Sequence, residues 1–110
     1  MTTEPQAEPQ VTDNPAASRF EIRLAADDAE PAGFVEYHLS GGEIAFLHTE
    51  TGPGHEGQGL AATLVRAALD SARRRQLAVL PYCPFVRVWI ARNREYTDLV
   101  PVDRRVRFDL

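Results

Sequence analysis

The stretch that decides the fold reads EIAFLHTET (43–51), GPGHEGQG (52–59) and LAATLVRAALDSARRR (60–75). Apolar residues alternate in the first part, which predicts a strand. Glycine and proline interrupt regular structure in the second part. In the third part leucine and alanine recur at helical spacing opposite arginine and aspartate, which predicts a helix from about Gly59 to about Arg75. The expected order is a strand, a glycine-rich turn and an amphipathic helix.

The residues at the start of this helix predict an anion site. The sequence Glu56-Gly57-Gln58-Gly59-Leu60-Ala61 opens the helix, and the first backbone N–H groups of a helix have no partner within it. With the positive end of the helix dipole they attract a phosphate or pyrophosphate, and glycine keeps the approach free of side chains. The alternative is that the glycines only make an irregular connection. A P-loop is excluded because no Gly-Lys-Ser/Thr occurs, and the third glycine of a dinucleotide fingerprint is missing.

Alternation predicts two more strands upstream, beginning at Arg19 and Val35, and Ser40-Gly41-Gly42 has the composition of a tight hairpin turn. Three successive strands of this kind form an antiparallel meander. Downstream, Leu77–Leu80 is a short apolar run, typical of a buried strand that runs parallel to 43–51 after a crossover helix. Within 43–51, alternation places two sets of side chains on opposite sides: Ile44, Phe46 and His48 on one, and Ala45, Leu47 and Thr49 on the other.

Proline at 84 suits the first position of a second helix, which we expect from Phe85 to about Arg92. Residues 1–18 contain almost no large apolar side chain and are expected to form a flexible tail, whereas 19–110 are expected to form one domain. The predicted fold is α/β (α+β): a three-stranded meander, a helix, a parallel strand and a second helix, with about four strands in a mixed sheet. Residues 101–110 receive no assignment.

Charge is distributed unevenly along the chain. Residues 1–50 hold ten acidic residues and two arginines, and residues 51–110 hold six acidic residues and ten arginines. The first half would attract a cationic amine and the second an anionic cofactor; the alternative is a surface asymmetry without function. The net charge of −4 argues against a partner bound mainly through phosphates. Nucleic-acid binding by the arginines at 73–75, 104, 105 and 107 is therefore the weakest alternative.

The chain has a single cysteine, Cys83, which excludes an intrachain disulfide. Because no cluster of Cys and His occurs at metal-ligand spacing, we expect no structural metal. The N-terminus lacks a signal pattern, and no apolar run approaches the roughly 20 residues of a membrane span. These features predict a cytoplasmic protein with no membrane partner.

The order of three antiparallel strands, a Q/R-x-x-G-x-G/A signature on Glu56–Ala61 and a parallel strand resembles the GNAT superfamily of acyl-CoA N-acyltransferases. More narrowly, His48-Thr49-Glu50, EGQGLA, Pro81-Tyr82-Cys83 and Arg92–Tyr96 are similar to its short acetyltransferase-like branch. The resemblance covers roughly Phe20 to Val100. It implies that acetyl-CoA binds with its pyrophosphate on 56–61 and its pantetheine arm along about Leu47–Thr51. Glu56 departs from the signature, because a carboxylate there repels pyrophosphate unless it points away.

Acetyl transfer to an amine needs a base for the amine and a proton for the leaving thiolate. Cys83 ends the buried strand at the start of the second helix, where a thiol can be activated, and the resemblance implies a role as nucleophile or proton donor; the alternative is a core cysteine. His48 is the candidate base or carbonyl ligand; the alternative is a packed histidine. Asn93 contacts the pantetheine arm or only caps the helix. Glu36, Glu43 and Glu50 are weaker candidate bases, and Tyr82, Trp89 and Tyr96 are expected in the core.

The sequence thus predicts an acetyl-CoA-binding N-acetyltransferase that acts, as a monomer or weak dimer, on a primary amine of a protein, a peptide or a small molecule. The alternative is a non-catalytic CoA-binding or regulatory module.

Overall fold

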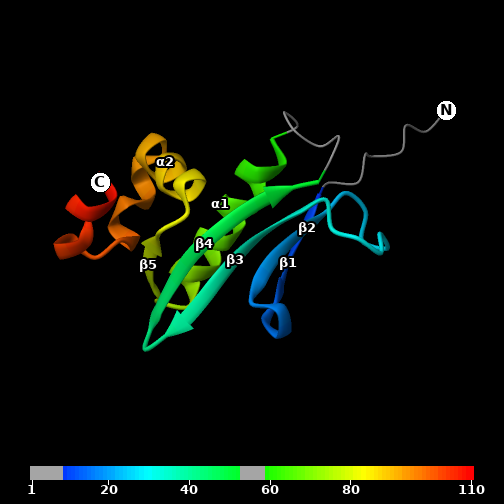
Figure 1. Cartoon of the computed structure of the whole chain (residues 1–110), viewed down its shortest axis with the longest axis horizontal. Helices are drawn as coiled ribbons and strands as arrows, with labels where there is room; N and C mark the ends of the chain where they lie inside the picture. The colour runs from blue at the N-terminus through cyan, green and yellow to red at the C-terminus, as the bar shows by residue number, and fades with distance from the viewer. Residues whose placement is uncertain (1–8, 53–58) are drawn as a thin grey trace.

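The chain forms a five-stranded sheet with the strand order β1-β2-β3-β4-β5 (Figure 1). The computed structural model describes residues 9–52 and 59–110. Strands β1 to β4 are antiparallel neighbours, and β5 runs parallel to β4. The strands are β1 Gln10–Asn14, β2 Arg19–Arg23, β3 Gly33–Ser40, β4 Glu43–Thr51 and β5 Ala78–Pro81. The predicted meander and parallel strand are confirmed, and the sheet has one strand more than expected.

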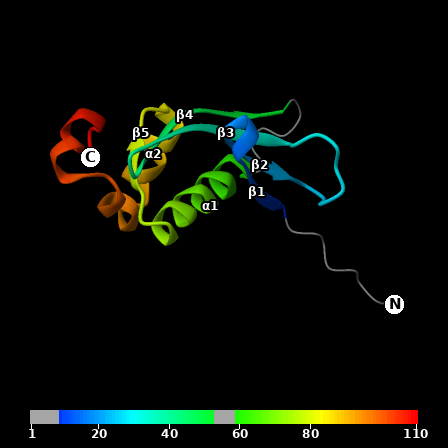
Figure 2. The ribbon, with the colours of Figure 1, turned by 90° about the horizontal axis from the view of Figure 1, so that it is seen from below.

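Two α-helices follow β4 and β5. They are α1 Leu60–Arg74 and α2 Pro84–Arg92, within a residue or two of the predicted bounds. Short 3-10 turns are η1 Pro15–Ala17, η2 Arg94–Leu99, η3 Val102–Arg104 and η4 Val106–Phe108. Figure 2 shows α1 lying along one face of the sheet, which we call the helix face. In the part of the chain that the structure describes, no α-helix covers the opposite face, which we call the open face. Nor is any helix of that part long and apolar enough to cross a membrane.

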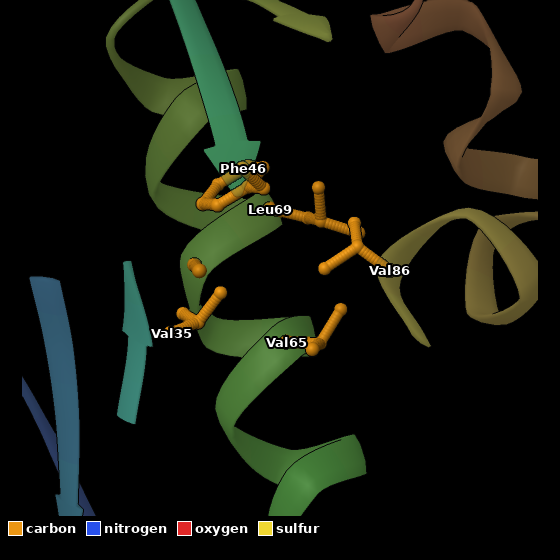
Figure 3. Close-up of a pocket in the computed structure, with 6 residues that line it drawn as sticks. Val35, Phe46, Val65, Leu69 and Val86 are labelled. Atoms are coloured by element: carbon orange, nitrogen blue, oxygen red, sulfur yellow. The ribbon is translucent and has the colours of Figure 1, made fainter. Parts of the chain in front are cut away.

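Phe46 lies at the centre of the core, where the sheet meets both helices (Figure 3). Its ring lines one small space in the core together with Val35 of β3, Val65 and Leu69 of α1 and Val86 of α2. Local periodicity produces this arrangement, since the apolar side chains of α1 recur on the one stripe of the helix that faces the sheet. The core therefore joins the helix after β4 to the helix after β5.

Strand β1 corrects the prediction that residues 1–18 form a flexible tail. Gln10–Asn14 pairs along its whole length with β2, and only Val11 among its residues packs on the core. An edge strand is stabilised by backbone hydrogen bonds and tolerates polar side chains, so hydrophobicity alone does not reveal it. The described part of the domain begins before Arg19.

A hydrogen bond between β3 and β1 predicts a dependence of stability on alkaline pH. The hydroxyl of Tyr37 donates to Asp13 at 2.6 Å, and burial together with this carboxylate raises the pKa of Tyr37 to about 12. In the unfolded chain a tyrosine titrates near pH 10. The folded state thus binds the proton more tightly between about pH 10 and 12, and the stabilisation is complete below pH 10 and is lost as the pH rises toward 12.

The urea midpoint of the wild type is therefore expected to fall between pH 10 and 12, and Tyr37→Phe is expected to flatten that fall. Tyr82→Phe, an exposed tyrosine on β5's C-terminal side, is the matched control and should keep the wild-type slope. Burial and a hydrogen bond to Asp70 also raise the pKa of Tyr96, which leaves part of the slope in both variants. An unchanged slope in Tyr37→Phe would show that the Asp13 contact does not hold the proton.

The C-terminal residues 101–110, unassigned from the sequence, dock beside β5 and α2 through 3-10 turns (Figure 1). Phe108 is buried and meets the ring of Tyr82 edge-on at 5.2 Å between centroids. Arg104 forms an ion pair with Glu43 at 3.2 Å. This segment therefore anchors Tyr82 at the end of β5.

Candidate active site

Strands β4 and β5 separate part-way along β4. Their parallel pairing ends at Phe46 and Pro81, and one more hydrogen bond, from the backbone N–H of Cys83 to the carbonyl of Phe46 at 2.8 Å, holds them together at that point. Strand β4 continues to Thr51. Within residues 9–52 and 59–110, the edge of β4 beyond Phe46 that faces β5 has no strand partner. The separation exposes backbone donors and acceptors to an extended ligand.

A β-bulge in β4 lies at this separation and decides which way the side chains point. Phe46 pairs with Tyr37, but the next pair joins His48 to Glu36, so Leu47 is an extra residue. In such a bulge two successive side chains share a face and the alternation reverses beyond it. Leu47 and His48 both lie on the open face, and Thr49 turns to the helix face with its strand partner Val35.

The bulge corrects the expected grouping of Ile44, Phe46 and His48. Ile44 and Phe46 are buried, whereas the side chain of His48 is 55% exposed. Its Nε2 lies 3.6 Å from a carboxylate oxygen of Glu50, and its ring lies beside Phe34. His48 is therefore not a packed core histidine. It stands in solvent on the open face, beside the carboxylate of Glu50.

Cys83 lies at the N-cap of α2, with Pro84 at the first helical position as predicted. The residue is 3% exposed, and its Sγ lies 3.2 Å from the hydroxyl of Thr49. Thr49 and Cys83 thus meet across the separated strands on the helix face. The thiol has a polar partner and a helix N-terminus beside it, an arrangement that differs from that of a cysteine packed only among apolar groups.

The start of α1 follows β4 at the same end of the sheet (Figure 1). Gly59 is its N-cap with φ of 72°, a left-handed conformation that favours glycine, and no side chain of the described residues caps the helix. The N–H groups of Leu60 and Ala61 belong to the first turn, which has no intrahelical acceptors. The predicted anion-site residues Glu56, Gly57 and Gln58 lie outside the described residues.

Asn93 serves as a helix cap in this structure. Its side-chain amide donates to the carbonyl of Trp89 at 2.8 Å, and its backbone N–H donates to Ile90. Trp89 and Tyr96 are in the core, as predicted. Tyr82 was expected there too, but it is 45% exposed, because it follows Pro81 at the point where the strands separate.

Sequence reasoning also missed a buried charge on the open face. Glu21 is 4% exposed and bonds to the side chains of Arg19, Arg23 and Asn14. Burial acts to raise the pKa of Glu21, but these hydrogen bonds outweigh it and lower the pKa below its ordinary value. The available signal was the alternation of Arg19, Glu21 and Arg23 in a strand. Within residues 9–52 and 59–110, no cluster of three or more His, Cys, Asp or Glu could hold a metal ion.

Comparison with known proteins agrees with this geometry. The model of a family described as GCN5-related N-acetyl-transferase matches residues 19–99. The chain belongs to the GCN5-related N-acetyltransferase family. The predicted GNAT resemblance is thereby confirmed, and with it the membership of an acetyltransferase family.

A solved structure shares the fold of this GCN5-related chain. It is the solution NMR structure of a GCN5-like protein from Staphylococcus aureus, provisionally assigned as an N-acetyltransferase. The TM-score is 0.63 at 22% sequence identity, and the match covers 87% of this chain and 89% of that one. A search of curated proteins found no match. The likeness in structure supports the α/β fold assignment over nearly the whole chain.

Proposed function

We propose that this GCN5-related chain is an acetyl-CoA-dependent N-acetyltransferase whose reaction takes place where β4 and β5 separate. The observation that carries the proposal is the meeting of Cys83 and Thr49, 3.2 Å apart, at the end of the paired part of the two strands. A family of acetyltransferases needs a bound acyl donor and a group that handles protons beside it. The separated strands offer a place for the first, and Cys83 is a candidate for the second.

The residues of the separation fit acetyl-CoA. The pantetheine arm of CoA carries two amides, and the backbone of β4 from Leu47 to Thr51 presents matching donors and acceptors along an edge without a strand partner in the described chain. At the end of this edge, Gly59, Leu60 and Ala61 begin α1, where backbone N–H groups and the helix dipole suit a pyrophosphate. We assign Glu56, Gly57 and Gln58 to the same phosphate loop from the sequence signature alone. Asn93, engaged as a cap, is assigned no contact.

Acetyl-CoA supplies an activated thioester carbonyl, so the chain needs only to position two substrates and move protons. His48, on the open face, would accept the proton that the attacking amine releases as its C–N bond forms. The carboxylate of Glu50 lies 3.6 Å from Nε2 of this imidazole. Cys83 would hold a proton at Sγ for the departing sulfur as the C–S bond breaks, or act as the nucleophile. His48 lies on the open face of the sheet and Cys83 on the helix face, which suits proton uptake on one side and proton release on the other.

Thermal unfolding with and without acetyl-CoA tests the donor. Ligand at about a hundred times its dissociation constant adds about 2.7 kcal/mol to the free energy of unfolding, which for a domain of this size raises the midpoint by about 10 °C or more. Acetate at the same concentration is the control and should cause no shift. No shift with millimolar acetyl-CoA would contradict the proposal. A shift of the thermal midpoint without acetyl transfer to any amine would indicate a CoA-binding module instead of an enzyme.

A further inference from the structure

We propose that a groove on the open face binds the acceptor, and that the acceptor is a primary amine carried on an apolar chain. This inference rests on the proposed function, because an acceptor site presupposes acetyl transfer. The groove has a volume of about 370 Å³. Its lining comes from β3, β4 and β5 and from the residue after β5: His38, Ser40, Glu43, Ala45, Leu47, Leu80 and Tyr82.

The groove leads to the point where the strands separate. The last paired residues of β4 and β5 are Phe46 and Pro81, and the next residue on each side, Leu47 and Tyr82, lines the groove. Cys83 follows Tyr82 directly and lies on the helix face with Thr49. A molecule in the groove therefore approaches the separation from the side opposite α1. This approach leaves the edge of β4 to the acyl donor.

The floor of the groove is apolar and preformed. Ala45 and Leu80 are partners across the two strands, and Leu47 and Tyr82 are 49% and 45% exposed. Phe108 holds the ring of Tyr82 edge-on, so the ring does not have to be ordered when a ligand binds. An aliphatic or aromatic chain would remove this apolar surface from water, whereas a polar chain would gain little.

Charge at the separation suits a cation. The bulge turns His48 to the open face beside Leu47. Its strand partner is Glu36 of β3, and a carboxylate oxygen of Glu50 lies 3.6 Å from its Nε2. The carboxylate of Glu43, at the far end of the groove, is already paired with Arg104 at 3.2 Å. Two carboxylates, Glu36 and Glu50, thus lie near His48, and Arg19, the partner of Glu36 in β2, is itself paired with Glu21. The ammonium group would lie at the end next to His48, with the apolar chain along Leu47, Ala45 and Tyr82.

Backbone NMR shifts of the full chain test the groove without any turnover. Titration with n-hexylamine is expected to shift the amides of His38, Ala45 and Tyr82, and 2-(2-aminoethoxy)ethanol, similar in length but polar, is expected to bind at least tenfold more weakly. Ala45→Phe fills the groove from its floor and should weaken hexylamine binding at least tenfold. Thr12→Phe, on the same face in β1, is the matched control and should bind as the wild type does.

A second arm distinguishes the source of the amine. A peptide beginning with leucine should shift the same amides if the acceptor is a protein N-terminus, and only hexylamine should do so if it is a small amine; either result supports the groove. Shifts elsewhere, or wild-type binding by Ala45→Phe, would overturn the inference.

A parallel titration with acetyl-CoA separates the two proposals. If acetyl-CoA shifts the amides of residues 49–51 and 59–61 but no amine shifts those of the groove, only the groove proposal is contradicted. If acetyl-CoA causes no shift, the proposed function is contradicted, and the acceptor role of the groove with it.

Discussion

Cys83→Ala is expected to slow acetyl transfer at least about 100-fold while acetyl-CoA still raises the thermal midpoint. General acid–base catalysis by a positioned side chain contributes about 10²- to 10⁴-fold, and Cys83 carries the one thiol in the chain. The substitution removes a small side chain whose one hydrogen bond among the described residues joins it to Thr49, so the fold should survive. The measurement is the rate of acetyl transfer at saturating acetyl-CoA, beside the thermal midpoint of each variant.

Two further variants show what the sulfur does. Thr49→Val keeps the shape of the side chain but removes the hydroxyl 3.2 Å from Sγ, and it is expected to lower the rate by about tenfold, less than the loss of the thiol. Cys83→Ser restores a hydroxyl but neither the acidity nor the nucleophilicity of a thiol, and it should remain as slow as Cys83→Ala. Full activity in Cys83→Ala would show that Cys83 is only a core cysteine. The departing sulfur would then take its proton from solvent.

Phe46→Ala is expected to lower the free energy of unfolding by about 3–5 kcal/mol, the usual cost of truncating a buried phenylalanine. Phe46 is 1% exposed and lines a space shared by side chains of β3, α1 and α2 (Figure 3), so we expect that no single element can move in to replace it. Domains of this size are stable by about 5–15 kcal/mol. The variant should therefore be close to unfolding at ambient temperature.

Urea unfolding of purified protein measures this loss, and Phe85→Ala is its matched control. Phe85 is 41% exposed on the outer side of α2, and its truncation should cost about 1 kcal/mol or less. Equal losses in the two variants would contradict the central position of Phe46. The carbonyl of Phe46 also accepts the N–H of Cys83, so a partly folded Phe46→Ala should lose acetyl-CoA binding as well.

Local patterns predicted most of the fold. The bounds of β4 and α1 followed from alternation and helical spacing, since a helix or strand with one buried face must repeat its apolar residues at the period of its own geometry. The turn at Ser40-Gly41-Gly42 followed from glycine, and both glycines have positive φ. The family signature lies within the same local stretch.

The errors arose where a distant contact decides the structure. Strand β1 has almost no apolar pattern and is held by backbone bonds to β2, which a sequence does not display. The side of His48 was predicted wrongly because one extra residue in β4 reverses the alternation, and a bulge depends on the register with β3. Tyr82 was expected in the core because its exposure depends on where β4 and β5 part.

The sequence by itself determined the family and most of the order of elements, and it supplied the residues proposed to carry chemistry, because each depends on short-range periodicity or on a motif. Only the tertiary structure decided how those residues are arranged: Cys83 against Thr49 on the helix face, His48 with Glu50 on the open face, and a groove leading to the separation between them. The physical reason is that side-chain direction in a sheet is set by the pairing of neighbouring strands. A single bulge in that pairing moved a candidate base from one face of the molecule to the other.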